Sequence, residues 1–388
     1  MRSAVLTAFV FFVVLLGTTV PTPLLALYER SFGVSPLGVT VIFGIYAIGV
    51  VACLLTFGHL SDEIGRRPVL AAALILSGLA AIGFLVADST AVLLGARVVS
   101  GLAAALVTGA ANAALGEQLP PGRRGLAPVM SVIATMGGLA AGTLVAGLLA
   151  QWAGYPLRLS WVVDLALVGV GLLALLFVAE TVRERTRPHL RRLQVPSGIR
   201  ATFLRVSTPA AAGFGVLGVI SATTGVLLAA ELHLHDPAVT GIVLFLAFAS
   251  TAVGQLLDHR LPPAMSPLAA CVALIVSACL IATAVLAPSL AALIVAAVVA
   301  GLGTGTGLSA GLRLIGSHVA EEQRGAAFSL YFVVLYSALA LPAIGVGVLT
   351  ELAGLRWAGT LFAVALALVS LAAFVGLRTM RPAPDHPH

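Results

Sequence analysis

The feature that most limits how this chain can fold is a series of apolar runs separated by short polar turns. A helix rises about 1.5 Å per residue, so about 20 apolar residues cross the roughly 30 Å hydrocarbon core of a bilayer. A membrane β-barrel would instead show short strands of alternating polarity. We place predicted spans at residues 4–27, 37–60, 69–87, 91–115, 126–152, 159–180, 209–230, 238–257, 268–287, 290–314, 326–350 and 358–377.

The first run has a second interpretation as a cleaved signal peptide, because one arginine precedes an apolar core and small residues follow it. We favour an uncleaved first span, since the run is long and an even number of spans requires it. Composition agrees with a membrane protein: 9% of the residues are charged, whereas soluble domains are about 25% charged. We therefore predict an all-α membrane protein of twelve transmembrane helices.

The arginines predict which side of the membrane each turn faces. The chain has no lysine; 17 of its 21 basic residues lie on one side of the predicted spans, 3 lie on the other, and Arg97 lies within a span. Because positive residues stay on the cytoplasmic side, we expect cytoplasmic termini in the plasma (inner) membrane. Topology thus accounts for the net charge of +6 without nucleic acid as a partner.

An Arg-rich segment divides the chain into two sets of six spans. We predict an N-terminal bundle over residues 1–180, a cytoplasmic linker over 181–208, and a C-terminal bundle with a short tail over 209–388. Two interpretations of the linker stay open. It can lie on anionic lipid headgroups, as basic segments beside membranes do, or it can be a solvated connection.

Matching residues indicate that the two halves are duplicates. Gly58 and Asp62 follow the second span, and Gly254 and Asp258 follow the eighth, 196 residues later. Other matches, 200 residues apart, are Gly101 with Gly301 and Arg124 with Arg324. Duplicated halves around a central pathway are typical of transporters. We expect two pseudo-symmetric six-helix bundles with a substrate site between them.

The most specific signal is the charged turn GHLSDEIGRRPVL, between the second and third spans. It resembles the loop signature of the major facilitator superfamily, through Gly58, Leu60, Asp62, Gly65, Arg66 and Arg67. The resemblance covers nearly the whole chain and implies the major facilitator fold, with alternating access by rocking of the halves. It also implies that this turn is a conformational switch that engages the eleventh span in one state and releases it in the other.

The residue types in this turn suit such a switch. Gly65 permits a tight turn, and Asp62 is placed to accept hydrogen bonds from a helix N-terminus. The predicted switch partners are Glu117, at the end of the fourth span, and Arg324, just before the eleventh. The alternative is that the charges only enforce topology. The second copy lacks the Gly-Arg-Arg part, so by resemblance its role should be weaker.

Arg97 and Asp164 are the candidate coupling residues. A charge inside a spanning helix costs at least about 2.5–3.5 kcal/mol, so it normally has a partner. Arg97 is about six residues into the fourth span, and Asp164 is about five residues into the sixth, which runs the same way. We predict that the two are paired or linked through water, and that Asp164 is the proton site. The alternative places both near the outer interface.

The first span contains Pro21 and Pro23, which should kink the helix and free backbone carbonyls. Leu16-Gly17 followed by these prolines resembles a pattern of proton-linked drug exporters. Two features depart from that branch: the fifth span has Thr143 where exporters have proline, and the first span has no acidic residue.

The substrate cavity is expected to draw polar residues from several spans. The candidates are Thr19, Thr22, Tyr46, Asn112, Met136, Thr223, Thr224, Thr304 and Tyr336. Because few charges belong to the set, a neutral or weakly cationic apolar substrate is the expectation.

The predicted function is secondary active transport, most like proton-coupled efflux of small amphipathic or drug-like compounds, with a proton-coupled nutrient importer as the alternative. The chain has no P-loop and no H-E-x-x-H or G-x-S-x-G motif, which disfavours ATP-driven transport and a membrane enzyme. A receptor or scaffold on the same fold should lack the charged turn. The expected partners are a small-molecule substrate, protons and the lipid bilayer. We expect a monomer that uses the proton gradient, without a cofactor or metal.

Overall fold

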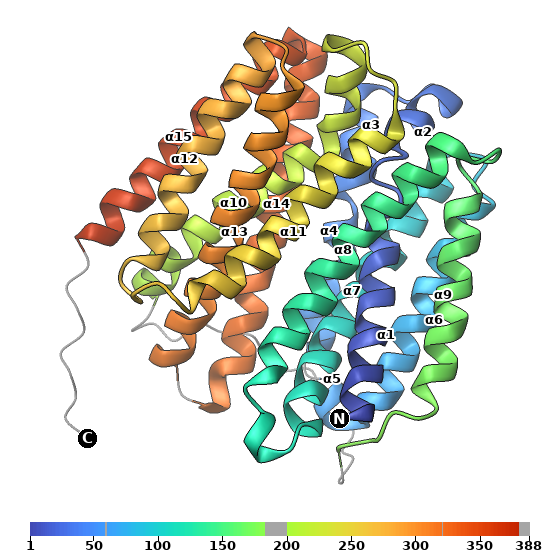
Figure 1. Ribbon diagram of the computed structural model, residues 1–388, viewed down its shortest axis with the longest axis vertical. Helices are drawn as coiled ribbons and strands as arrows, with labels where there is room; N and C mark the ends of the chain where they lie inside the picture. The colour runs from blue at the N-terminus through green and yellow to red at the C-terminus, as the bar shows by residue number, and fades with distance from the viewer. Residues whose placement is uncertain (59, 183–199, 320, 380–388) are drawn as a thin grey trace.

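The computed structural model describes residues 1–58, 60–182, 200–319 and 321–379. Regular structure in these ranges is helical (Figure 1). The helices of the first half are α1 (Arg2–Thr19), α2 (Leu25–Phe32), α3 (Pro36–Gly44), α4 (Tyr46–Phe57), α5 (Leu60–Ile64), α6 (Arg66–Leu85), α7 (Thr90–Gln118), η1 (Pro121–Arg123), α8 (Leu126–Trp152) and α9 (Leu159–Leu175). Those of the second half are α10 (Arg200–Glu231), α11 (Pro237–Asp258), α12 (Ser266–Leu286), α13 (Leu290–His318), α14 (Glu321–Ala353) and α15 (Leu355–Arg378).

These helices confirm the prediction of an all-α membrane protein. Within the described ranges, 11 segments are long and apolar enough to cross a membrane, with α3 and α4 counted together as Pro36–Phe57. α9 is a further apolar helix of 17 residues, so the twelve-span arrangement is accounted for. Most of the predicted linker, residues 183–199, lies outside the described residues, as does Arg381 of the tail. The proposed bundle boundaries remain predictions.

Two predicted spans are interrupted. α1 ends at Thr19, and a turn that contains Pro21 and Pro23 separates it from α2. Proline lacks a backbone N–H and clashes with the carbonyl four residues earlier, so it ends an α-helix. The second interruption is at Ile45, between α3 and α4.

The same helix pairs pack together in both halves. α7 packs against α4 and α6, and α13 packs against the corresponding α11 and α12. A Cβ added to Gly101 would collide with the carbonyl oxygen of Tyr46, and one added to Gly301 would collide with that of Ala247. Close approach of helices through small residues is therefore repeated at matched positions.

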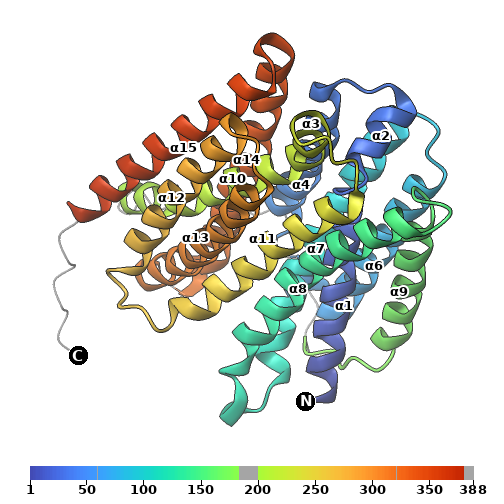
Figure 2. The same ribbon diagram turned by 45° about the horizontal axis from the view of Figure 1, so that its top comes forward.

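The halves meet along two seams. α8 packs against α11, and α14 packs against α3 and α4. Figures 1 and 2 both show α8 and α11 side by side where the halves join. The interrupted α3–α4 span therefore belongs to the interface between the halves.

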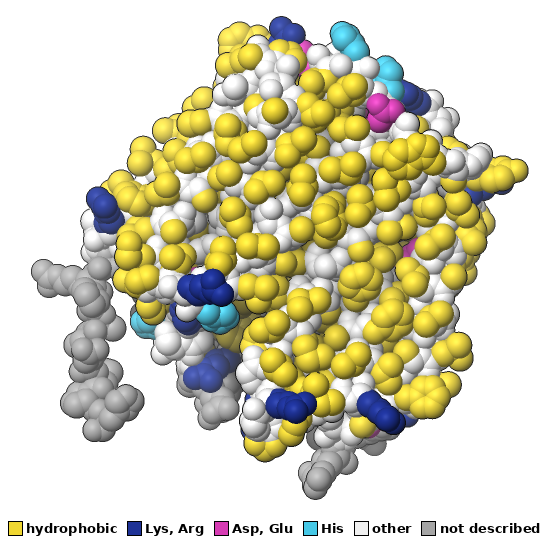
Figure 3. All heavy atoms as spheres, viewed as in Figure 1, with side chains coloured by type: hydrophobic (Ala, Val, Ile, Leu, Met, Phe, Trp, Pro, Cys, Tyr) yellow, Lys and Arg dark blue, Asp and Glu magenta, His cyan; other side chains and the backbone are white. Residues whose placement is uncertain are grey.

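The surface divides into bands. Figure 3 shows an apolar belt over the middle of the molecule, with several dark-blue basic side chains near the lower end, where Figure 1 places the N-terminus. We call this end the Arg-rich face; it carries Arg2, Arg67, Arg123 and Arg260. The end that carries α2 is called the opposite face.

Candidate functional site

A cavity of about 580 Å³ lies between the two halves. Its walls come from α1, α3, α4, α7 and α8 of the first half and from α10, α11, α13 and α14 of the second. Much of the wall is aromatic or aliphatic, and includes Phe43, Met136, Leu139, Phe214, Leu217, Phe248, Phe328 and Phe332. A cavity of this kind suits a ligand with a large apolar part.

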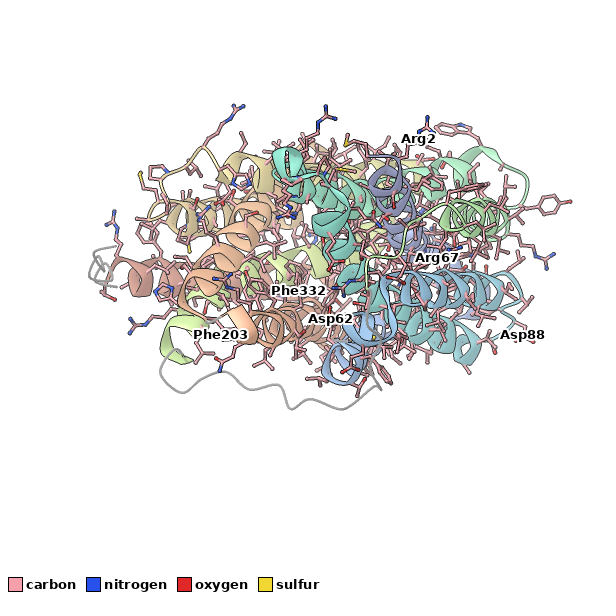
Figure 4. All side chains as sticks on the ribbon, turned by 90° about the horizontal axis from the view of Figure 1, so that it is seen from below. Arg2, Asp62, Arg67, Asp88, Phe203 and Phe332 are labelled. Carbon is pink, nitrogen blue, oxygen red and sulfur yellow. The ribbon has the colours of Figure 1, made fainter. Side chains whose placement is uncertain are left out.

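The cavity is reached from the Arg-rich face. Its lining includes Ala127 and Pro128 at the start of α8, and Asp258 and His259 at the end of α11, which are helix ends on that face. Figure 4, seen from this face, places Phe332 near the middle of the molecule, between the two halves.

Contacts between the halves close the opposite face. Gln151 Nε2 donates to Asp236 Oδ1 at 2.8 Å, which joins the end of α8 to the residue before α11. Arg30 Nη2 and His235 Nδ1 lie 2.7 Å apart. The molecule is thus open on one side and closed on the other, as an inward-open or outward-open state of an alternating-access cycle is.

Arg97 of α7 lines the cavity with 2% of its surface exposed. Each of its nitrogens donates to a backbone carbonyl: Nε to Ile42 at 3.0 Å, Nη1 to Thr18 at 2.8 Å and Nη2 to Phe43 at 3.1 Å. The guanidinium carbon lies 5.0 Å from the ring centre of Tyr46, within the range of a cation–π interaction. Arg97 is therefore held by main-chain groups and an aromatic ring.

The carbonyls that accept from Arg97 lie at the two helix interruptions. In a continuous α-helix the N–H of Thr22 would donate to the carbonyl of Thr18, but here it donates to Thr19 at 3.0 Å. The prolines of this turn prevent the helix from continuing, as expected. The other two carbonyls belong to the last turn of α3, next to its break. Arg97 thus satisfies acceptors that the interruptions expose.

Arg97 and Asp164 form no direct pair, and a link through water stays a prediction. Asp164 is 1% exposed, and neither of its oxygens has a hydrogen-bond partner among the described residues. It faces α1 and α6 instead: a Cβ built on Gly17 would lie 2.9 Å from Asp164 Oδ2 and 3.2 Å from Ser77 Oγ. Equal depth in the membrane does not fix the rotation of a helix about its axis, so it does not by itself bring two side chains into direct contact.

Arg66 is the centre of the charged turn. Its side chain is 8% exposed and forms ion pairs with Asp62 and with Glu117, where Nη2 and Oε1 are 2.8 Å apart. Arg66 Nη1 also donates to Ser61 Oγ at 2.7 Å, and Glu117 accepts from the hydroxyl of Thr181. The turn, the end of α7 and the beginning of the segment between the halves are joined through this network.

Glu180 lies at the N-terminus of α6, a position for which no residue was predicted. Its carboxylate accepts from the backbone N–H of Arg66 at 2.9 Å and of Arg67 at 3.1 Å, which are the first residues of α6. Gly65 precedes them with φ of 110°, a conformation that favours glycine. A Cβ at Gly65 would lie 2.5 Å from Glu180 Oε2. The tight turn and the capping carboxylate therefore depend on each other.

The balance of forces at Glu180 favours its charged form. Burial raises the pKa of this carboxyl group, but the hydrogen bonds from backbone N–H groups outweigh burial and hold the pKa below its usual range. Sequence reasoning missed Glu180 because it lies beyond the turn motif. The available signal was its position as the last acid before the Arg-rich segment.

The predicted partner Arg324 makes no ion pair with Asp62 in the described part of the chain. Its Nε donates to a backbone carbonyl at the end of α13, at 3.3 Å. The turn does approach α14 through Gly58, where an added Cβ would lie 3.0 Å from Ser329 Oγ. Leu60 packs against the core of the first half. The switch role of these residues stays a prediction.

The second turn contains an ion pair that the sequence did not suggest. The Asp258 side chain is 1% exposed and pairs with Arg313 of α13. It also accepts from Ser266 Oγ at 2.5 Å, at the first residue of α12. Arg313 had been counted only for topology, and the pair lines the cavity.

Of the nine predicted cavity residues, those that line the cavity are Thr19, Thr22, Tyr46, Asn112, Met136 and Tyr336. Thr223 and Thr224 instead line a separate cavity of about 30 Å³ within the second half. Thr304 is buried against Gly213 of α10. Contact with substrate stays a prediction for the six lining residues. Sequence reasoning missed the phenylalanines, because an apolar residue does not stand out in an apolar span.

Comparison with known proteins gives the family. The family model described as Major Facilitator Superfamily matches residues 7–287. A protein of Bacillus subtilis (strain 168), named "Uncharacterized MFS-type transporter YybF", is 27% identical over 148 residues. That alignment covers 38% of this chain and 35% of the relative, so the chain matches about a third of that protein's length.

Solved structures with the same fold match nearly the whole chain. The nucleoside transporter NupG, solved as a mutant, has a TM-score of 0.75 at 14% identity, over 97% of this chain and 100% of that one. The human organic anion transporter MFSD10 (TETRAN) has a TM-score of 0.72 at 18% identity, over 97% and 99%. A bacterial homologue of the human lysosomal transporter Spinster, in an inward-facing and occupied conformation, has a TM-score of 0.71 at 16% identity, over 98% of each chain. These structures show the fold, and the family match shows that the chain belongs to the major facilitator superfamily, a family of secondary transporters and not of enzymes.

Proposed function

We propose that the protein is a proton-coupled exporter of small amphipathic compounds. The observation that carries this proposal is the cavity of about 580 Å³, with aromatic and aliphatic walls drawn from both halves and access from one face. Such walls accept apolar bodies of varied shape by burial, while a few polar groups orient the ligand. The exporter-like pattern of Pro21 and Pro23, which interrupt the first span beside this cavity, supports the export direction.

Asp164 is the proposed proton site. It is a carboxyl group with 1% exposure and no hydrogen-bond partner among the described residues. A buried charge without a partner is costly, so burial favours the protonated form of Asp164. Uptake and release of this proton would couple transport to the proton gradient. It lies against α1, whose next residues after Gly17 line the cavity. We expect Asp164→Asn to retain substrate binding and to lose proton-driven accumulation.

The Arg-rich face is proposed to be cytoplasmic, which would place the cavity opening inside the cell. The positive-inside bias supports this orientation, as does similarity to a structure described as inward-facing. In this state Asp62 pairs with Arg66. Exchange of that contact for one with α14, as the halves rock, is the proposed switch.

The test is accumulation of amphipathic compounds in inside-out vesicles that contain the protein. A panel should include anionic, neutral and cationic fluorescent compounds of similar size, with vesicles that contain Asp164→Asn as the matched control. We expect accumulation that needs an imposed proton gradient and that a protonophore abolishes. Accumulation only in right-side-out vesicles would show an importer, and accumulation that a protonophore leaves unchanged would remove proton coupling.

A further inference from the structure

We propose that the transported compound carries an anionic head group, a carboxylate or a similar oxyanion, and that Arg97 binds it at the closed end of the cavity. This inference rests on the proposed function, because it names the substrate class for the same cavity. It replaces the expectation of a neutral or weakly cationic substrate, which was based on residue types before their positions were known.

The first argument is the charge of the cavity wall. Among the lining residues the charged side chains are Arg97, Asp258 and Arg313. Asp258 and Arg313 neutralise each other as an ion pair. The charge of Arg97 has no carboxylate partner among the described residues, since its three hydrogen bonds all go to backbone carbonyls and Asp164 lies elsewhere. The deep part of the cavity therefore has an uncompensated positive charge.

The second argument is the number of donors. A guanidinium has five N–H groups: one on Nε and two on each terminal nitrogen. Arg97 makes one hydrogen bond from each nitrogen, so each terminal nitrogen keeps one N–H without a partner among the described residues. A guanidinium plane with donors to spare can receive an oxyanion, and a carboxylate suits it because its two oxygens can accept from two N–H groups.

The third argument is that backbone carbonyls do not replace a counter-ion. They are dipoles that carry partial charges, and buried charges in proteins are normally paired with an opposite charge. Arg97 is 2% exposed in a spanning helix, where an unpaired charge is costly and usually functional. A bound anion would supply the missing charge, and the carbonyls hold the guanidinium in place to receive it.

The rest of the cavity fits the apolar body of such a compound. The wall contributed by the second half includes Phe214, Leu217 and Phe248. The wall contributed by the first half includes Tyr46 and Met136. An acid head held by the first half and an apolar body packed on the second would bridge the two halves. A ligand that contacts both halves can bias their rocking, because it interacts differently with the two states.

The experiment measures binding to the purified full-length protein with two probes of the same shape. Tritiated 4-phenylbutanoate is bound in a scintillation proximity assay and displaced by unlabelled 4-phenylbutanoate or by 4-phenylbutanamide, which lacks the charge. We expect the carboxylate to bind at least about tenfold more tightly than the amide, since a buried charge partner commonly contributes that much or more. Equal affinity for the two, including no binding of either, overturns the proposal.

Variants then place the effect at Arg97. Arg97→Gln should reduce carboxylate affinity by at least about tenfold and leave amide affinity within about twofold, and Arg97→Lys should retain part of the carboxylate preference. Arg123→Gln, an exposed arginine on the Arg-rich face, removes the same charge outside the cavity and should change neither affinity. An unchanged carboxylate preference in Arg97→Gln overturns the assignment. If Arg97→Gln does not fold, the wild-type comparison still decides the carboxylate preference, and a lower preference in Arg97→Lys assigns it to position 97.

These outcomes are separable from those of the proposed function. Binding needs no membrane gradient, so a carboxylate preference that depends on Arg97 would stand even if vesicle transport proved to be import or insensitive to protons. Conversely, proton-driven export of neutral or cationic compounds with no carboxylate preference would overturn this inference and leave the proposed function intact.

Discussion

The two charged turns, one in each half, differ in which member of the ion pair is buried. In the turn before α6, Arg66 is 8% exposed and Asp62 is 62% exposed. In the turn before α12, Asp258 is 1% exposed and Arg313 is 32% exposed. Glu117 lies one residue before the end of α7, whereas Arg313 lies five residues before the end of α13. Matched positions of these two helices are 200 residues apart, so Glu117 corresponds to Ser317 and not to Arg313. Each turn is thus tied to the long helix of its half by an ion pair, in which the helix supplies the acid in the first half and the arginine in the second, at positions that do not match.

The turn with the complete signature motif is therefore not the turn with the more buried aspartate. The first turn has the full signature and holds its aspartate in solvent, where an ion pair contributes little and can change partners. The second turn has lost part of the signature and buries its aspartate, where removal of the partner is costly. We therefore expect the first turn to govern transport and the second to govern stability.

The largest expected effect is at the second turn. Arg313→Ala leaves Asp258 buried without its cation, and should lower the free energy of unfolding by about 3 kcal/mol. The measurement is the thermal unfolding midpoint of the purified protein. Arg260→Ala, which removes an exposed arginine from the same turn, is the control and should shift the midpoint little. Equal losses for the two variants would contradict a special role for the buried pair.

Next in size is the effect of a side chain at Gly65. Gly65→Ala places a Cβ where φ is 110° and against Glu180, and strain of this kind costs about 1–3 kcal/mol. Gly122→Ala, in a turn with open space around it, is the matched control. Thermal midpoints of the two variants give the comparison. A Gly65→Ala midpoint equal to the control would mean that the turn tolerates another conformation.

A smaller effect should depend on pH. Because the folded-state pKa of Glu180 is held below its usual range, its hydrogen bonds add stability above the unfolded value, about 4.3, and lose it as the pH falls through the folded pKa. The contribution should be roughly 1 kcal/mol, since the carboxylate is partly exposed.

The measurement is the difference in thermal midpoint between wild type and Glu180→Gln as the pH is lowered. This difference should be constant above about pH 5 and should shrink below it. Asp88→Asn, an exposed acid on the opposite face, should show no such trend. A difference that does not change with pH would show that the ionised form of Glu180 is unimportant.

The smallest effect on stability should come with a large effect on transport. Asp62→Asn removes an exposed charge, so the free energy of unfolding should change by less than about 1 kcal/mol. Transport in vesicles should nevertheless be lost, if Asp62 exchanges partners during the cycle. Normal transport rates in this variant would show that the first turn serves only to orient the chain in the membrane. The proposed difference in role between the two turns would then be wrong.

The spans were predictable because an apolar run about 20 residues long has few alternatives to a membrane helix. Residues that stand out chemically, such as Arg97 and Asp62, were also found, because a charge in an apolar region has few structural uses. What the sequence could not supply were partners: Arg97 donates to carbonyls and not to Asp164, and Glu180, which was not predicted as a site residue, caps α6. The first depends on the rotation of helices about their axes and the second on the path of the chain after α9, and hydropathy leaves both undetermined.

The contacts of Arg97 also determine what mutagenesis can reveal. All three acceptors are main-chain oxygens, of Thr18, Ile42 and Phe43, and main-chain oxygens are the same in every amino acid. A scan that replaces residues one at a time would alter side chains at those positions and leave the acceptors in place. Substitutions at the three acceptor positions therefore leave this junction in place, and genetic variation reaches it through position 97 or through Pro21 and Pro23, which keep the Thr18 carbonyl free.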